Sequence, residues 1–176
     1  MYKNNLENDI KKDTSGAFKN VLVSLLTASR PTGNTVDVTQ AKEDAQALFN
    51  AGIKSWGTDE SKFVTILCTR SYAQLRATFE EYEKIGNKKL GDDIKKELSG
   101  SLLKVFSAII EIVKDSQAYY ASLIYKALKG LGTNEGSLNR AIISRCEIDM
   151  VQIKQKFKEL YKTSLVDYLK VRKNKF

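Results

Sequence analysis

The sequence Ala-Gly-Ile-Lys-Ser-Trp-Gly-Thr-Asp-Glu, at residues 51–60, is the stretch from which the organisation of this chain follows. Its Gly57-Thr58 step falls on Gly132-Thr133 when the chain is shifted by 132 − 57 = 75 residues. The same shift pairs apolar positions with apolar positions, including Phe63 with Leu138, Leu67 with Ile142, Tyr82 with Phe157 and Leu90 with Leu165. This period is longer than that of the common helical solenoids and indicates a large repeated unit.

Apolar residues recur at helical spacing along most of the chain, as they do at Leu102, Phe106, Ile109, Ile110 and Val113. No alternating pattern typical of a strand and of comparable length competes with them. Ser71 also stands where an N-cap precedes an apolar helical run. The sequence therefore predicts an all-α fold.

Two further marks divide the chain. Asp13-Thr-Ser-Gly16 is echoed by Glu97-Leu-Ser-Gly100, and the only proline, Pro31, lies in a polar, turn-rich stretch. We expect residues 1–28 to be the tail of a preceding repeat and 29–37 to be a linker. Residues 38–113 are then a complete repeat, and 114–176 are an incomplete repeat that lacks its final helix.

Composition narrows the possible functions. Histidine is absent, so the commonest general base and the commonest zinc ligand are missing, and we predict that the protein is not an enzyme. No stretch supplies the roughly 18 apolar residues that a transmembrane helix needs. Cys68 and Cys146 lie in apolar runs and are expected to be buried thiols of a cytosolic protein. The net charge of +8 favours anionic partners, either nucleic acid or acidic lipid.

The loop around Trp56 also has a composition that suits a hard cation. Glycines stand near both of its ends, at Gly52 and Gly57, and permit backbone conformations that turn carbonyl oxygens toward one point. Calcium takes about six to eight oxygen ligands, and Glu97 at the end of a later helix can supply a carboxylate. Arg70 and Arg145 recur in register and are expected to cap carbonyls or to pair with an internal acid.

The glycine-containing loops at 55–60 and 129–135, the arginines Arg70 and Arg145 that follow them, and the DTSG and ELSG helix ends together resemble the annexin repeat. The resemblance covers nearly the whole chain, which looks like the carboxy-terminal part of an annexin: the end of the second repeat, the third repeat and most of the fourth. It implies annexin-like repeats of about five helices each in a curved all-α array. It also implies calcium as the cofactor, acidic phospholipid membranes as the partner, and a cytoplasmic protein that becomes peripheral at membranes when calcium rises.

The resemblance further implies particular ligands. The third-repeat site would use the carbonyl oxygens of Gly52, Ser55 and Gly57 with the carboxylate of Glu97, and Trp56 would contact the membrane. In the fourth repeat the matching carbonyls belong to Leu128, Gly130 and Gly132, whereas the acidic position is occupied by Arg172. A cation at that position repels calcium, so we expect the fourth site to be weak or absent.

Two alternatives to calcium-dependent membrane binding stay open. A basic helical module that binds nucleic acid or other polyanions without calcium fits the charge, but no recognition motif supports it. An enzyme that uses Asp, Glu or Lys has only scattered carboxylates in its favour.

Apolar surface around Ile142, Val151 and Leu160 is expected to be uncovered and to promote self-association.

Overall fold

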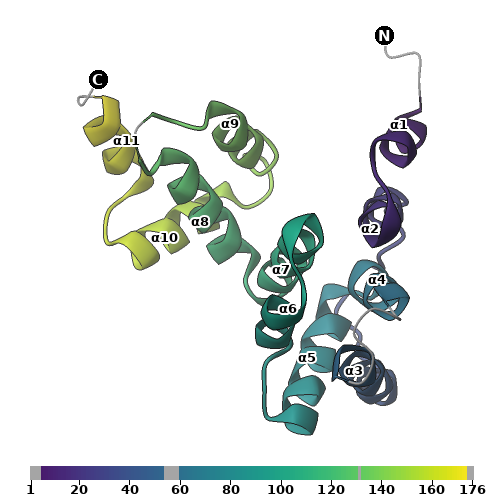
Figure 1. The fold of residues 1–176 in the computed structure, drawn as a ribbon. Helices are drawn as coiled ribbons and strands as arrows, with labels where there is room; N and C mark the ends of the chain where they lie inside the picture. The colour runs from purple at the N-terminus through teal and green to yellow at the C-terminus, as the bar shows by residue number, and fades with distance from the viewer. Residues whose placement is uncertain (1–4, 54–59, 131, 174–176) are drawn as a thin grey trace. The chain divides into compact units, whose positions relative to one another are not determined.

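The computed structural model describes residues 5–53, 60–130 and 132–173, and every regular element in these ranges is a helix (Figure 1). The helices are α1 (Leu6–Asp13), α2 (Gly16–Leu26), α3 (Val38–Ile53), α4 (Glu60–Thr69), α5 (Tyr72–Gly86), α6 (Leu90–Glu97), α7 (Gly100–Lys114), α8 (Ser116–Leu128), α9 (Glu135–Ile143), α10 (Met150–Tyr161) and α11 (Leu165–Lys173). The all-α prediction is confirmed. Among the described residues, no helix is both long and apolar enough to cross a membrane.

The chain forms two compact units, Met1–Val113 and Lys114–Phe176, and each has its own hydrophobic core. In the first unit α3 packs on α4 and α5, and α2 packs on α4. Helix α7 joins the same core through Phe106, whose ring lies 6.1 Å from that of Phe63. In the second unit α8 packs against both α9 and α10.

Helix ends follow local capping chemistry. The Ser71 hydroxyl accepts a hydrogen bond from the Gln74 backbone N–H at 3.1 Å, which confirms the N-cap predicted for α5. Asp115 caps α8 in the same way, accepting from the Ala118 N–H at 2.9 Å. Asn87, the C-cap that follows the last residue of α5, has a φ of 49°, the left-handed conformation that commonly ends a helix.

The α1–α2 and α6–α7 junctions have the same construction. Helices α1 and α6 each have 8 residues and end on an acid, Asp13 and Glu97 respectively. Two residues follow each acid, the first of them extended (Thr14 and Leu98), and each next helix begins at a glycine with positive φ, 59° at Gly16 and 61° at Gly100. Residues other than glycine rarely adopt this backbone conformation, which explains why a glycine follows the serine at both junctions.

Residues 28–37 are tied to the first unit by two side chains. Arg30 donates to the backbone carbonyl oxygens of Arg70 and Leu67, the latter at 2.6 Å, and so caps the end of α4. The Gln74 amide forms two hydrogen bonds of 2.8 Å with the backbone N–H and C=O of Asp37. The predicted linker is therefore held in place by specific hydrogen bonds.

The second unit has an aromatic core and an exposed apolar face. The rings of Tyr125 and Tyr161 stack at 3.8 Å, and Phe157 and Tyr168 pack around them. Val151 and Leu160 are exposed as expected, whereas Ile142 packs partly against the core. Cys68 is buried as predicted, but the prediction for Cys146 is wrong, because this thiol is exposed in the turn that follows α9.

Candidate metal centre

Glu97 is the predicted acidic ligand, and its carboxylate lies half-buried at the last position of α6. Beside it, the Tyr82 hydroxyl donates to Asp93 at 3.0 Å. Burial of Tyr82, this hydrogen bond and the negative charges of Asp93 and Glu97 raise the pKa of the phenol well above its usual range. The ionised Glu97 carboxylate is thus close enough to act on a neighbouring buried group.

The charge of Glu97 is not neutralised by an ion pair with any residue that the structure describes. An acid in the last turn of a helix faces the negative end of the helix dipole, where a cation is favoured instead. Lys95 and Lys96 in the same turn satisfy that preference, but both are exposed. The end of α6 therefore presents a partly buried negative charge with helix carbonyl groups near it, which is an environment that attracts a cation.

Gly52 lies in the last turn of α3, which is in contact with α6. Its backbone is helical, so the expectation that Gly52 supplies an unusual backbone conformation is wrong. Carbonyl groups in a last helical turn lack intrahelical partners, and that of Gly52 fits the predicted role through this property instead. The other predicted residues of this loop, Ser55, Gly57 and the membrane-contact residue Trp56, lie outside the described residues.

The two helices that flank this loop are fixed by a bidentate ion pair. Arg70, just after α4, donates to Asp44 of α3 from Nε at 2.6 Å and from Nη2 at 3.0 Å. Asp44 is buried and also accepts a hydrogen bond of 3.1 Å from Gln40. The hydrogen bond from Arg70 to Asp44 raises the pKa of the Arg70 guanidinium. The pair confirms that Arg70 meets an internal acid.

The second unit has an equivalent pair with a different acid. Arg145 donates to Asp149 at 2.8 and 2.7 Å, and Gln117 of α8 donates to the same carboxylate at 3.0 Å. The hydrogen bond from Arg145 holds the pKa of Asp149 below its usual value. Both recurring arginines therefore anchor the chain between two helices.

The junction after α8 is built on two glycines in the left-handed region, with φ of 108° at Gly130 and 83° at Gly132. The Asn134 backbone N–H donates to the Ala127 carbonyl at 2.9 Å and closes this loop. Leu128, the third predicted ligand here, is the buried last residue of α8. Arg172 lies in the last turn of α11, and its side chain lies outside the described residues.

The described residues contain no group of three or more His, Cys, Asp or Glu side chains that could hold a metal ion together. A cation at either junction would depend on backbone oxygens, with Glu97 as the one added carboxylate at the first. Calcium accepts this kind of donor set, whereas zinc and the other transition metals prefer nitrogen or sulfur ligands. The residues present therefore fit calcium.

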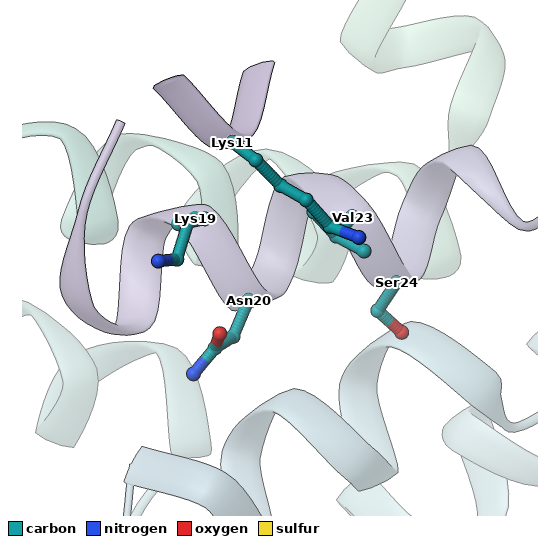
Figure 2. Close-up of a pocket in the computed structure, with 5 residues that line it drawn as sticks. All are labelled: Lys11, Lys19, Asn20, Val23 and Ser24. Atoms are coloured by element: carbon teal, nitrogen blue, oxygen red, sulfur yellow. The ribbon is translucent and has the colours of Figure 1, made fainter. Parts of the chain in front are cut away.

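Two hollows on the first unit are lined by described residues. One, of about 550 Å³, lies where the α1–α2 and α6–α7 junctions meet, and its lining includes Asp13, Ser15 and Ser99. The other, of about 320 Å³, runs along α2, and Figure 2 shows Lys11 of α1 alongside Lys19, Asn20, Val23 and Ser24 of α2. The second hollow has no carboxylate in its lining and does not resemble a calcium site.

Comparison with known proteins shows the family of the chain. The family model for annexins matches residues 43–109 and 119–173. The chain belongs to the annexin family. Annexin A4 of Homo sapiens is 45% identical over 170 residues, which are 97% of this chain and 53% of that protein. Annexin A13 of Mus musculus is 46% identical over 167 residues, 95% of this chain and 53% of that protein. The chain therefore spans about half the length of these annexins.

Solved annexins share the fold. Annexin III superposes with a TM-score of 0.93 at 44% identity, covering 97% of this chain and 53% of that one. The calcium-bound structure of annexin (Sm)1 superposes with a TM-score of 0.83 at 27% identity, covering 97% of this chain and 50% of that one. Annexins are known for calcium-dependent phospholipid binding and are generally binding proteins without enzymatic activity.

Proposed function

We propose that this chain binds acidic phospholipid membranes through a calcium ion held between the end of α3 and the end of α6. The observation that carries the proposal is the half-buried Glu97 carboxylate, which has no ion pair among the described residues and ends a helix in contact with α3. The carbonyl oxygens of Gly52, Ser55 and Gly57 would hold the ion together with this carboxylate. Bound calcium would leave coordination positions for water or for a lipid phosphoryl oxygen.

The remaining residues of the loop have supporting roles in this proposal. Trp56 would rest at the level of the lipid headgroups, the depth that tryptophan favours. The ion pair between Asp44 and Arg70 would keep the helices on either side of the loop at a fixed separation. The protein would be cytoplasmic and would move to membranes when calcium rises.

We propose that the junction formed by Leu128, Gly130 and Gly132 is a weak calcium site or none at all. Its glycines allow the loop conformation, but Arg172 stands where Glu97 stands in the other repeat. We also propose the division into a repeat tail (1–28), linker (29–37), complete repeat (38–113) and incomplete repeat (114–176).

Self-association is part of the proposal. Position 143 corresponds to Cys68 through the 75-residue shift, and Cys68 is 2% exposed whereas Ile143 is 71% exposed. Helix α2 packs on α4, the helix that carries the buried Cys68. Ile143 and the neighbouring Ile148 would be covered by a second copy of the chain.

Sedimentation with vesicles tests the calcium site. Vesicles of phosphatidylcholine with phosphatidylserine would be compared with phosphatidylcholine alone, with and without calcium, for the unmodified chain, Glu97→Gln and Trp56→Ala. Glu97→Gln should raise the calcium concentration needed for half-maximal pelleting by about tenfold or more. The matched control is Glu111→Gln, which removes the same charge from an exposed position of α7 and should change nothing. Equal effects of the two substitutions would refute the assigned ligand.

A further inference from the structure

The net positive charge of the chain is divided very unequally between its two units. Residues 114–176 contain 13 of the 29 Lys and Arg residues and 6 of the 21 Asp and Glu residues, an excess of 7. Residues 1–113 contain the other 16 basic and 15 acidic residues, an excess of 1. Nearly all of the net charge of +8 therefore belongs to the second unit, in which Arg172 of α11 stands at the position that corresponds to Glu97.

Helix α10 concentrates part of this charge on one face. Lys154 and Lys158 are four residues apart, so they lie one above the other on the helix, and Lys162 follows at its C-cap. All three are exposed. Val151, one turn before Lys154, extends the same face and is 66% exposed. We define these four residues as the basic face of α10.

The rest of α10 adds no unpaired acid beside these lysines, among which the exposed Gln155 also lies. Ile153 and Phe157 point into the core of the unit and are fully buried. The one acid of the helix, Glu159, lies 3.2 Å from Lys156, which also pairs with Asp115 at 3.2 Å. None of the lysines of the basic face forms an ion pair with a residue that the structure describes.

We infer that the basic face of α10 binds acidic phospholipid surfaces directly, without calcium. This goes beyond the proposed function, since it concerns another surface in the other unit and a different physical force. Lysines near an anionic leaflet each strengthen binding by about fivefold. Their long stems let the ammonium groups reach the headgroups while Val151 meets the apolar boundary beneath them.

The same face fits nucleic acid less well. Proteins that bind single strands stack bases on exposed aromatic rings, but the aromatic side chains Tyr125, Phe157, Tyr161 and Tyr168 are packed on one another in the core. The exposed uncharged side chains beside the lysines are Val151 and Gln155, and neither offers an aromatic stacking surface. An acyl-chain boundary is the partner that suits Val151.

The test is vesicle sedimentation of the full chain in excess chelator, with phosphatidylcholine alone and with added phosphatidylserine. We expect pelleting on the acidic vesicles only, and a steep loss of pelleting as salt is raised. Substituting Lys154, Lys158 and Lys162 by Gln together should weaken this binding on the order of 100-fold. Substituting Val151 by Gln should also weaken the calcium-free binding to acidic vesicles, but should leave the salt dependence of that binding unchanged.

A matched control removes the same charge from the nearly neutral unit. Lys42, Lys88 and Lys104 are exposed there, and their triple Gln variant should retain most of the calcium-free binding. Circular dichroism would verify that both triple variants are folded. Equal losses in the two variants would overturn the inference, because net charge alone would then explain the binding.

Two other outcomes would also overturn it. One is no calcium-free pelleting on acidic vesicles at low salt, and the other is tighter binding to a single-stranded oligonucleotide than to the vesicles at the same salt. Glu97→Gln separates this inference from the calcium site, because it should leave the calcium-free binding intact while reducing the calcium-dependent binding. Either activity can therefore fail without the other.

Discussion

The ion pair between Asp44 and Arg70 gives a test of how α3 and α4, the helices on either side of the proposed calcium loop, are held. Arg70→Met removes the guanidinium but keeps a long apolar stem, and leaves the Asp44 carboxylate, which is 4% exposed, with Gln40 as its remaining hydrogen-bond donor. Removing one partner of a buried ion pair typically costs about 3–5 kcal/mol. Arg70 is itself 32% exposed, so water can reach the vacated position, and we expect about 3 kcal/mol.

Two further variants separate the loss of the pair from the loss of the side chain. The double substitution of Asp44 by Leu and Arg70 by Met should recover most of the loss, because an apolar pair leaves no buried charge behind. The control is Lys84→Met, which breaks the ion pair with Glu81 that has the same 2.6 Å separation but an exposed cation. We expect no measurable change in stability from the control.

The assay follows from the single tryptophan. Trp56 belongs to the first unit, so its fluorescence during urea unfolding follows that unit, whereas circular dichroism follows both. Arg70→Met should lower the fluorescence midpoint and leave the circular dichroism change of the second unit in place. A loss of under about 1 kcal/mol, or a double variant as unstable as the single one, would refute the reasoning.

The remaining predictions concern single groups. The pKa of Asp149 is depressed in the folded state, so its pair with Arg145 stabilises the second unit at neutral pH. This stabilisation is lost as the pH falls below about 4. Arg145→Met should therefore make the free energy of unfolding of the second unit depend less steeply on pH in the acid range. Absorbance titration at alkaline pH should reveal a late-ionising tyrosine component that Tyr82→Phe reduces. Arg30→Gln should destabilise the first unit by about 1–2 kcal/mol, measured by the same fluorescence assay, because carbonyls at the end of α4 lose their donor. Ile143→Ser should shift sedimentation velocity profiles toward monomer, and an unchanged profile would exclude this face as the self-association surface.

The sequence was sufficient to predict the helices because their apolar period and their caps are local properties. The N-cap at Ser71 depends on residues within one turn, and the similar ends of α1 and α6 can be recognised from the DTSG and ELSG sequences. Glu97 could be proposed as a ligand for the same reason, since it stands in a repeated motif. The ligands in the loop around Trp56 stay predictions.

The partners of the arginines could not be predicted from the repeat. Arg70 and Arg145 are in register, but the 75-residue shift places Asp44 on Tyr119 and Asp149 on Gln74. Each recurring arginine thus pairs with an acid, but the acids lie on different elements, one in α3 and the other at the start of α10. Cys146 was misjudged for a related reason, because its apolar run continues past the end of α9 into an exposed turn.

The two proposed membrane contacts differ in the charge that each requires. A calcium bridge needs a negative charge at the helix end, which the first unit has in Glu97 and the second replaces with Arg172. A direct contact needs an excess of cations, which the second unit has and the first nearly lacks. Arg172 is not part of the basic face of α10, so under these proposals its replacement by Glu should leave most of the calcium-free binding to acidic vesicles in place. If this change also added calcium-dependent binding in a Glu97→Gln background, the glycine loop after α8 would be a competent site that lacks only its carboxylate.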